Sequence, residues 1–518
     1  MADLSKKFYF PIWSGSFAES VDNESTRHSE IKGLELMESA GLAVAEQVLA
    51  LCSPHRKVIT LAGKGNNGGD AIVAAIHLSK KNINVKIIIV EPPQSSSCKL
   101  QMERAQSIGI PIESWTPNKI SWPSAAIIID GFLGLGVRGQ LRESDIKACL
   151  EEANKHRGEV FAIDLPSGLD PDCWKQGAPP LPANHTVTFG QFKPAHVHWP
   201  TKGFCGNITV RKIGFAEEAI SKADPDQNCM WQLLDQEKII KESPFQQLAS
   251  DSHKYDRGHV LVIGGSPGKY GAPLITAMGA LRTGAGWATI ALPEKITPIG
   301  QHIPPEITFE PFFTNSKLDI ELFNKFVSER KVSSVVLGPG TLKQFINKKT
   351  VDCFKQLQEK RNIFIVIDAG ALHGIGDLLS HTPLNPELTL LTPHPGEWRK
   401  LSITRPVPEP DSNPKNIKQI YKDLLLFGTT AIYKNAAPIV FDPKLQKAIV
   451  NNNGRLCIAK AGTGDLLAGI AAAHGKFWSA SGSALRAQAL IYHAAKIEEE
   501  NRGPEGVLPT DLLQRIGI

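Results

Sequence analysis

A glycine-rich turn between an apolar strand and an apolar helix constrains this fold most. The stretch LAGKGNNGGDA occupies residues 61–71 and follows the β-type run KVITLAG. Behind the turn, apolar residues such as Ile72, Val73 and Ile76 recur at helical spacing. Such a turn aims backbone N–H groups and the positive end of the helix dipole at one point, where an anion can bind. The pattern therefore predicts a ligand-binding turn, with a tight turn that needs glycine at positive φ as the structural alternative.

Short β-type runs alternate with helix-like segments throughout residues 57–214, which predicts a doubly wound, mainly parallel sheet. A second strand–turn–helix unit opens at residue 258, and further strands follow it. The runs AIYKN, PIVFD and KAIVNNN predict an antiparallel meander, and the glycine turn AGTGD opens a later helix. We expect two α/β domains, 1–225 and 226–518, joined by a linker near 225–232.

Composition excludes several classes of protein. The 518 residues carry a net charge of +5, and the basic residues are scattered among acids, so nucleic acid is not an expected partner. The eight cysteines include no CxxC pair, which favours reduced structural thiols. The N-terminal stretch lacks a signal-peptide apolar region, and no apolar run approaches the roughly 20 residues of a membrane span. We expect a cytoplasmic enzyme.

Three polar clusters follow predicted strands of the first domain: NNGGD at 66–70, DGFLGLGVRG at 130–139 and DLPSGLDPD at 164–172. Strand ends of a doubly wound sheet converge on one crevice. Asp130 and Asp164 stand directly after apolar strands, where a carboxylate can act as general acid or base. A cap or turn residue is the alternative interpretation.

Asn67, Asp130 and Ser167 are hard oxygen donors that could hold an alkali or alkaline-earth cation or simply form hydrogen bonds. The scattered histidines 185, 196 and 198 are interpreted as packing residues, because no carboxylate motif accompanies them.

The turn AGTGD suits phosphoryl chemistry. Gly462 and Gly464 leave backbone N–H groups free for a phosphate, and Asp465 stands at the start of the helix, where it could take a proton from a hydroxyl. An N-cap aspartate is the alternative.

With these motifs identified, both halves resemble known families. Residues 25–215 resemble the NAD(P)H-hydrate epimerase domain, through LMESAG, GKGNNGGDA, DGFLGLGVRG, DLPSGLDPD and VTFGQFKP. Residues 250–518 resemble the ribokinase-like NAD(P)H-hydrate dehydratase domain, through HVLVIGGSPGKYGAP, ALRTGAG, LGPG, LTPHPGEW and AGTGDLLAG. The order is that of the fused bacterial repair enzyme.

The resemblance implies a Rossmann-like first domain that interconverts the R and S hydrates of NADH and NADPH. It implies a ribokinase-like second domain that dehydrates the S hydrate at the expense of ADP or ATP, with Mg²⁺ and, in the first domain, potassium. It also implies a homo-oligomer.

Carried over residue by residue, the resemblance assigns site roles. Asp164 is the implied acid/base of the epimerase, and Asp465 activates the hydroxyl in the dehydratase. The implied substrate contacts are Asn66, Asn67, Gly68, Gly69, Asp70, Gly134, Leu135, Gly136, Val137, Arg138, Gly139, Gln140 and Asp164, then Ala272, Gly340, His394 and Asp465. The implied nucleotide contacts are Lys434, Asn435, Ala436, Ala437, Pro438 and Gly464. The implied potassium ligands are Asn67, Asp130 and Ser167.

The second domain departs from the family pattern. It has DAGA at 368–371 in place of Asp-Ala-Asp-Ala, KNAAP at 434–438 in place of Lys-Gly-x-x-Thr, and Lys460 with Ala461 before the last turn in place of Thr and Gly. In the first domain, Ala71 replaces a usual glycine. We therefore expect weaker nucleotide contacts with the Asp465 chemistry retained. The alternatives are an epimerase with a degenerate second domain, a ribokinase-class small-molecule kinase, and a non-catalytic scaffold.

Overall fold

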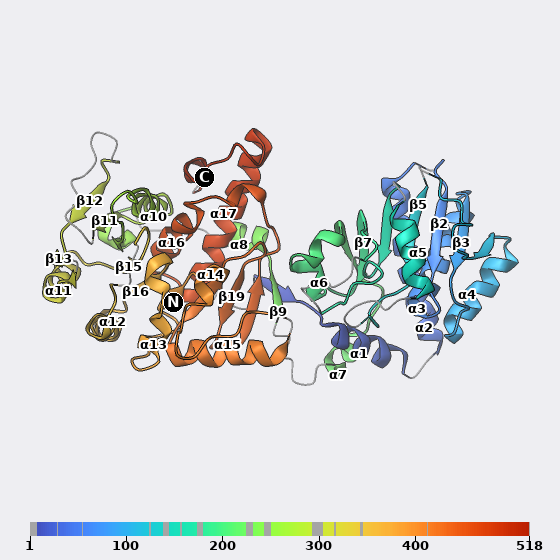
Figure 1. The fold of residues 1–518 in the computed structure, drawn as a ribbon, viewed down its shortest axis with the longest axis horizontal. Coiled ribbons are helices and arrows are strands. Elements are labelled where there is room, and N and C mark those ends of the chain that lie inside the picture. Colours follow the sequence, from blue (N-terminus) through green and yellow to red (C-terminus); the bar gives the residue numbers. More distant parts are fainter. Residues whose placement is uncertain are drawn as a thin grey trace. The chain divides into compact units, whose positions relative to one another are not determined.

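The computed structural model describes residues 8–27, 30–53, 55–123, 126–137, 144–155, 158–172, 180–223, 231–242, 250–292, 304–314, 317–341, 345–411 and 413–516. It divides into two compact units (Figure 1). The N-terminal unit is Pro11–Trp231, and the C-terminal unit combines Met1–Phe10 with Gln232–Ile518. The described residues 8–10, which the sequence placed in the first domain, are thus grouped with the second.

The N-terminal unit is built on a seven-stranded sheet in the order β4-β3-β2-β5-β6-β7-β8. All of its described strand pairs are parallel, as predicted. The strands are β2 (Val58–Ala62), β3 (Val85–Ile89), β4 (Ile112–Ser114), β5 (Ile127–Gly131), β6 (Val160–Ile163), β7 (His185–Phe189) and β8 (Asn207–Arg211). The helices are α1 (Gly15–Thr26), α2 (Glu30–Leu51), α3 (Asn66–Lys80), α4 (Ser96–Ser107), α5 (Asp145–Asn154), α6 (Pro194–Val197) and α7 (Glu217–Ala223).

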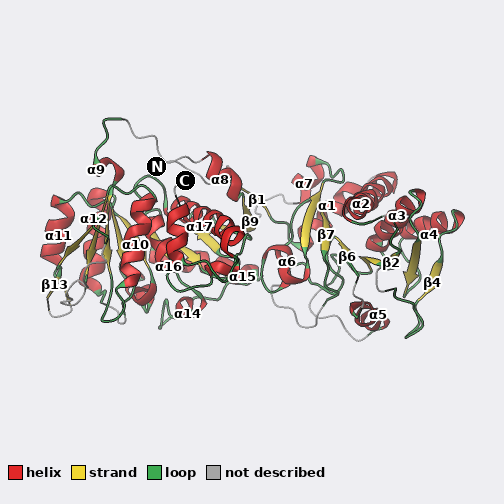
Figure 2. Ribbon diagram, turned by 90° about the horizontal axis from the view of Figure 1, so that it is seen from above, coloured by secondary structure: helices red, strands yellow, loops and turns green. Residues whose placement is uncertain are grey.

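Both faces of this sheet are covered, which explains why its strands are continuous apolar runs. In β5, Ile127 and Ile129 join a core cluster with α2, α3 and α4, whereas Ile128 joins a second cluster with α5. The alternation follows from the two-residue period of a strand. Figure 2 shows helices on both sides of the strands in each unit. The loops at the strand ends are left open to ligands.

The C-terminal unit contains an eleven-stranded sheet in the order β1-β9-β20-β19-β18-β17-β16-β15-β10-β11-β12. The strands are β1 (Tyr9–Pro11), β9 (Trp231–Leu234), β10 (His259–Ile263), β11 (Trp287–Ala291), β12 (Ile307–Glu310), β15 (Ser334–Leu337), β16 (Phe364–Ile367), β17 (Thr389–Leu391), β18 (Thr430–Tyr433), β19 (Ile439–Asp442) and β20 (Lys447–Val450), with a separate hairpin of β13 (Phe313–Thr314) and β14 (Lys317–Leu318). The pairs from β12 to β18 are parallel, and β18–β19–β20 is the predicted antiparallel meander.

Small residues let two helices of this unit pack closely. A Cβ atom on Gly469 of α16 would lie 2.0 Å from the carbonyl oxygen of Thr276 on α10, and one on Gly279 would lie 2.9 Å from Leu466. This contact holds the start of α16 against α10. The helices are α8 (Gln236–Glu242), α9 (Lys254–Arg257), α10 (Gly271–Arg282), α11 (Ile320–Glu329), α12 (Lys348–Arg361), α13 (Ile375–Leu379), α14 (Pro395–Trp398), α15 (Pro414–Phe427), α16 (Thr463–His474), α17 (Ala480–Arg502) and α18 (Pro509–Arg515).

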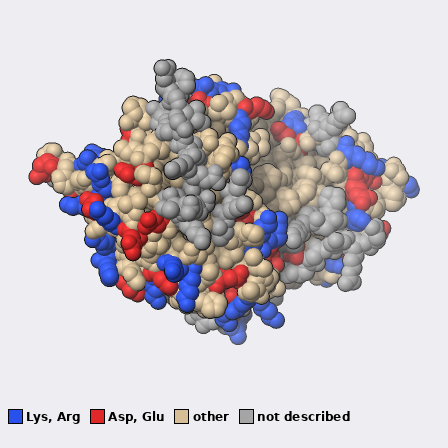
Figure 3. All heavy atoms as spheres, turned by 60° about the vertical axis from the view of Figure 1, so that its left-hand side comes forward, with Lys and Arg blue, Asp and Glu red and all other residues tan. Residues whose placement is uncertain are grey.

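The face of the molecule in Figure 3 carries Lys and Arg side chains interspersed with Asp and Glu. Among the described residues, no helix is both long and apolar enough to cross a bilayer.

Candidate functional site

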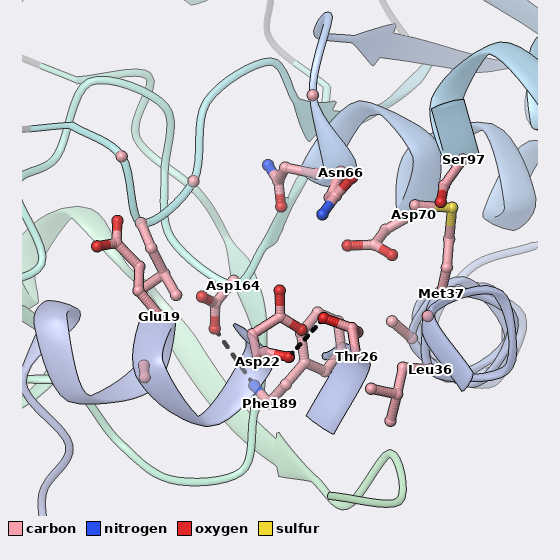
Figure 4. A pocket seen from close by; sticks show the side chains of 18 of the residues that line it. Glu19, Asp22, Thr26, Leu36, Met37, Asn66, Asp70, Ser97, Asp164 and Phe189 are labelled. Atoms are coloured by element: carbon pink, nitrogen blue, oxygen red, sulfur yellow. Dashed lines mark hydrogen bonds between the residues drawn. The ribbon is translucent and has the colours of Figure 1, made fainter. Parts of the chain in front are cut away.

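A cavity of about 740 Å³ lies at the carboxyl ends of the strands in the N-terminal unit (Figure 4). The loops after β2, β5 and β6 supply its walls, as expected for a doubly wound sheet. Of the residues that the sequence assigned to substrate, those lining this cavity are Asn66, Asn67, Asp70, Gly134, Leu135, Gly136 and Asp164. Segments distant in sequence are thus brought together around one space.

Two helix N-termini line the cavity. Helix α3 begins at Asn66, and its N-cap, Gly65, offers no side-chain cap to the first turn. Helix α4 begins at Ser96, and Ser96 and Ser97 line the same cavity. Each N-terminus presents backbone N–H groups and about half a positive charge. This end of the cavity suits an anionic group such as a pyrophosphate.

Not every residue assigned to substrate lies at the cavity. Gly68 and Gly69 do not line it, and their missing side chains serve packing: a Cβ atom would lie 1.9 Å from Gly63 O at Gly68 and 2.5 Å from Met37 Cε at Gly69. Val137 is also absent from the lining. Arg138, Gly139 and Gln140 lie outside the described residues.

Asp164 is the most constrained residue of the cavity. Its φ is +62°, a conformation that costs a non-glycine residue about 1 kcal/mol or more and persists only where the surroundings enforce it. Its Oδ1 accepts hydrogen bonds from Thr188 Oγ1 (2.7 Å), the Phe189 N–H (3.3 Å) and Lys193 Nζ (2.5 Å). No donor among the described residues reaches Oδ2, so this oxygen is available to a ligand.

Lys193 fixes the charge of Asp164. It is 1% exposed, and its ammonium also donates to Thr188 Oγ1 (2.9 Å) and Phe189 O (3.0 Å). Burial alone would raise the pKa of Asp164, but the nearby Lys193 charge and the hydrogen bonds outweigh burial and lower it. Asp164 is therefore an ionised carboxylate at neutral pH.

His196 connects the two partners of this ion pair. Its Nδ1 accepts a hydrogen bond from the Lys193 N–H, and its Nε2 donates to Asp164 O, both at 3.0 Å. Burial lowers the pKa of His196 to about 3, so the ring is neutral and can accept a hydrogen bond at Nδ1 while it donates one at Nε2. The sequence interpretation as a packing residue missed this bridge.

Two more aspartates line the cavity, and the environment of their carboxyl groups is opposite to that of Asp164. Burial, together with the charges of Asp22 and Asp164, raises the pKa of Asp70 well above its usual value. Burial and the charge of Asp164 raise the pKa of Asp22 on α1. Among the described residues, neither side chain has a hydrogen-bond donor or a cationic partner.

Asn67, Asp130 and Ser167 converge beside the cavity. Ser167 Oγ donates to Asp130 Oδ1 (2.5 Å), and its N–H donates to Asp130 Oδ2 (2.7 Å). Asn67 Nδ2 donates to Leu133 O (3.0 Å), so its Oδ1 stays available. Asp130 is fully buried without a cationic partner in the described chain, and burial raises its pKa to about 6. These oxygens fit a monovalent cation, since a single carboxylate is a sparse ligand set for a divalent one.

The second candidate site lies where β10, β15, β16, β17 and β18 end side by side. The segments that follow these parallel strands carry Ser266, Gly340, Asp368, His394 and Lys434. Ligands of open α/β sheets bind at this edge.

Lys434 lies between acidic side chains and the AGTGD turn. Its Nζ donates to Asp368 Oδ1 (2.7 Å), lies 3.9 Å from Glu397 Oε2, and would lie 3.2 Å from a Cβ atom on Gly464. Thr392 Oγ1 also donates to Asp368 Oδ1 (2.7 Å). The ammonium is therefore within reach of a phosphate held by the turn.

Asp465 has the properties of a general base. Burial and the charge of Asp368 raise its pKa to about 7, against the lowering effect of Lys434. No donor in the described part of the chain binds its carboxyl group. Helix α16 starts after Gly462 at φ +100° with no side-chain cap, and the buried Thr463 Oγ1 has no partner among the described residues. The turn thus offers unused donors to an anion.

The remaining residues assigned to this site are placed as follows. Gly340 has a φ of +72°, and a Cβ atom there would lie 3.2 Å from the Cβ atom of Ala272, so the position favours glycine. His394 caps α14 through Nδ1, which accepts the N–H groups of Gly396 and Glu397. In the KNAAP segment Asn435 closes its own turn by accepting the Ala437 N–H (3.0 Å). Ala436 is exposed, whereas Ala437 and Pro438 are buried.

Lys460, a departure from the family pattern, has a structural role. Its Nζ donates to the carbonyl oxygens of Glu505 (2.5 Å) and Val507 (2.6 Å), which ties the segment before α16 to the loop before α18. It does not extend toward the phosphate turn.

Comparison with known proteins gives the family. Residues 33–195 match the model described as YjeF-related protein N-terminus, and residues 260–517 match the NAD(P)H-hydrate dehydratase model. A bifunctional NAD(P)H-hydrate repair enzyme of Archaeoglobus fulgidus is 31% identical over 441 residues, which cover 85% of this chain and 83% of that relative. The chain belongs to the bifunctional NAD(P)H-hydrate repair enzyme family.

Other members of the repair-enzyme family are similar over most of their length. The Pyrobaculum aerophilum member is 29% identical over 93% of both chains, and the Escherichia coli member is 29% identical over 98% of this chain and 93% of its own. An ADP/ATP-dependent NAD(P)H-hydrate dehydratase from Bacillus subtilis, co-crystallized with ATP and Mg²⁺, is 22% identical, covers 54% of this chain and 95% of its own, and has a TM-score of 0.42.

The two candidate sites also contain Lys193, Asp368 and Asp22, which were not singled out from the sequence. Lys193 could have been found, because it lies in the family motif VTFGQFKP. Asp368 could also have been found, because it is the first residue of DAGA, the segment that departs from the family pattern. Asp22 gave no signal, since an acidic residue on an amphipathic helix is typical of a solvated face.

Proposed function

We propose that this chain repairs hydrated NADH and NADPH. The N-terminal unit interconverts the R and S hydrates, and the C-terminal unit dehydrates the S hydrate at the expense of ADP or ATP. Family membership supports both activities. The observation that carries the proposal is that each unit places an aspartate with a shifted pKa and a helix N-terminus without a side-chain cap at the carboxyl edge of its sheet.

In the N-terminal unit, the anionic backbone of the dinucleotide would lie at the N-termini of α3 and α4. Asp164 Oδ2 would exchange a proton with the oxygen on the hydroxyl-bearing carbon of the hydrate. In the free site, Lys193 keeps this carboxylate ionised. Potassium would be held by Asn67, Asp130 and Ser167, and it would neutralise the buried Asp130 charge and order the loop after β5.

In the C-terminal unit, Asp465 would take the proton from the hydrate hydroxyl, whose oxygen attacks a phosphate of the nucleotide. Lys434 and the N–H groups of the Gly462–Gly464 turn would stabilise charge that develops on that phosphate. The carboxylates of Asp368 and Glu397 are oxygen ligands of the kind Mg²⁺ prefers, and the ion would accompany the nucleotide. Phosphorylation turns the hydroxyl into a leaving group.

The test is incubation of the full chain with mixed R and S hydrates of NADH, without nucleotide, with ADP, and with ATP. We expect interconversion of the epimers in every sample, and recovery of reduced-nicotinamide absorbance with phosphate release only where a nucleotide is present. A stable phosphorylated product would instead indicate a small-molecule kinase. Epimerisation without nucleotide-driven recovery would leave an epimerase with a degenerate second domain. A cytoplasmic location and a homo-oligomeric state stay predictions.

A further inference from the structure

Three aspartate carboxyl groups from three separate elements face the cavity of the N-terminal unit. Asp22 comes from α1, Asp70 from α3 and Asp164 from the loop after β6, and Figure 4 shows their side chains around one hollow. Like-charged groups at such a site do not all ionise together at neutral pH. Of these three, only Asp164 has a cationic partner in the described chain, so the proton deficit falls on Asp164. Asp70 holds its proton because burial and the charges of Asp22 and Asp164 raise its pKa well above its usual value.

We propose that Asp70, supported by Asp22, is a second acid/base group of the epimerase and acts from a different side of the cavity than Asp164. This inference rests on the proposed epimerase function. Two carboxyl groups whose surroundings drive them into opposite protonation states form the usual pair of a proton donor and a proton acceptor. Here the donor is on α3 and the acceptor follows β6.

The proton transfers balance without another reagent. In one direction, the Asp70 proton passes to the hydroxyl oxygen on C6 of the hydrated ring, and the C6–O bond breaks with its electron pair leaving on water. The lone pair of ring N1 forms an N1=C6 iminium bond. A water molecule then adds to the opposite face of C6, and its proton passes to Asp164 Oδ2. The reverse direction uses the two aspartates in exchanged roles, and solvent resets the protons.

Asp22 is the positioning residue in this scheme. After burial, its charge is the largest cause of the raised pKa of Asp70. Its own carboxyl group is partly buried on α1 and has no donor among the described residues. The charged and titratable groups around Asp70 are Glu19 and Asp22 on α1, Lys64 before α3, Cys98 on α4, Asp164, and Lys193, with the Glu38–His77 pair farther along α2 and α3.

The first experiment follows the oxygen atom. The full chain is given the purified R hydrate of NADH in ¹⁸O-water, and the S hydrate is analysed by mass spectrometry. We expect each inversion to bring in one solvent oxygen, since the hydroxyl leaves as water. Retention of the original oxygen in the S hydrate would overturn the scheme. A parent protein that does not interconvert the hydrates at all would instead contradict the proposed function.

The second experiment uses variants. We expect Asp70→Asn to slow interconversion by roughly 10²–10⁴-fold, with parental hydrogen-exchange protection of the β2 and β5 peptides as the measure that the N-terminal unit is correctly folded. Asp22→Asn should retain activity at acid pH but lose it earlier as pH rises. The sign follows because removal of the Asp22 charge lowers the pKa of Asp70, which then gives up its proton at lower pH.

Glu19→Gln is the matched control, because Glu19 lines the same cavity one turn earlier on α1. It should leave the alkaline limb of the pH profile in place. The role of this pair is refuted if the Asp70→Asn protein interconverts the hydrates at the parental rate. It is also refuted if the activity of the Asp22→Asn protein falls at the same alkaline pH as that of the parent.

Discussion

The Lys193→Met substitution tests the central ion pair of the N-terminal unit. It keeps the length of the side chain but removes the ammonium from Asp164 Oδ1, Thr188 Oγ1 and Phe189 O. Asp164 is 6% exposed and would keep only neutral donors. Removal of one partner from a buried pair costs about 3–5 kcal/mol, because the other charge is left unpaired.

The size of this loss depends on pH in a defined direction. The carboxyl group of the variant can escape the penalty by binding a proton, which at about pH 7 costs about 4 kcal/mol for a group with an unfolded pKa near 3.9. At about pH 5 the same protonation costs only about 1.5 kcal/mol. The loss is therefore about 3–4 kcal/mol at about pH 7, and the variant should recover about 1.5–2.5 kcal/mol of unfolding free energy between these pH values. In the parent, Asp164 has a lower pKa in the folded state than in the unfolded state, so its stabilising contribution is fully present at every pH above the unfolded-state pKa. Asp164 therefore does not change the unfolding free energy of the parent between about pH 5 and about pH 7.

Native-state hydrogen exchange of β6 and β7 peptides, measured at rising urea concentration, gives the unfolding free energy of this region in the full chain. Lys64→Met is the matched control, since Lys64 lines the same cavity but pairs with Glu91 in an exposed ion pair (3.2 Å) worth at most about 1 kcal/mol. The reasoning is wrong if Lys193→Met costs less than about 1 kcal/mol at neutral pH, or costs the same at both pH values.

Three further results are expected. Asp164→Asn should slow interconversion of the R and S hydrates by roughly 10²–10⁴-fold while dehydration of the S hydrate continues, and a parental rate by chromatography would contradict its acid/base role. Replacement of potassium by tetramethylammonium should slow epimerisation, because Asp130 loses its counter-ion. An unchanged rate would show that the epimerase reaction does not depend on a potassium ion. For the dehydratase, kcat/KM should fall as pH drops below about 7, where Asp465 becomes protonated, and Asp465→Ala should abolish turnover; a flat profile would exclude Asp465 as the base.

The sheets could be predicted because parallel strands covered on both faces are continuous apolar runs with glycine turns after them. The edge strand β1 and its neighbour β9 could not, since runs of three or four residues carry too little periodicity. Gly68 and Gly69 show a different limit. Close packing of α3 and close approach of a ligand both require the absence of a Cβ atom, so only the folded structure distinguishes the two causes.

The two candidate active sites use the same residue types, yet the pKa of Asp164 is lowered and the pKa of Asp465 is raised. Lys193 donates directly to Asp164, so that aspartate stays ionised although it is buried. In the C-terminal unit, Lys434 donates to Asp368 instead, and Asp465 keeps a raised pKa beside two other carboxylates.

The two pKa shifts differ in direction because each lysine contacts a different kind of aspartate, and the order of strands in the sheet determines which aspartate that is. Lys193 follows β7 and meets the loop after the neighbouring strand β6, whereas Lys434 follows β18 and meets the end of β16, two strands away. The sequence can place an aspartate and a lysine at the ends of two strands, but it does not show whether the two side chains form an ion pair. A carboxylate paired with its lysine is ready to accept a proton at any pH above its lowered pKa, while an unpaired one titrates near neutrality. The epimerase step that depends on Asp164 should therefore tolerate mild acid that already inhibits the step that depends on Asp465.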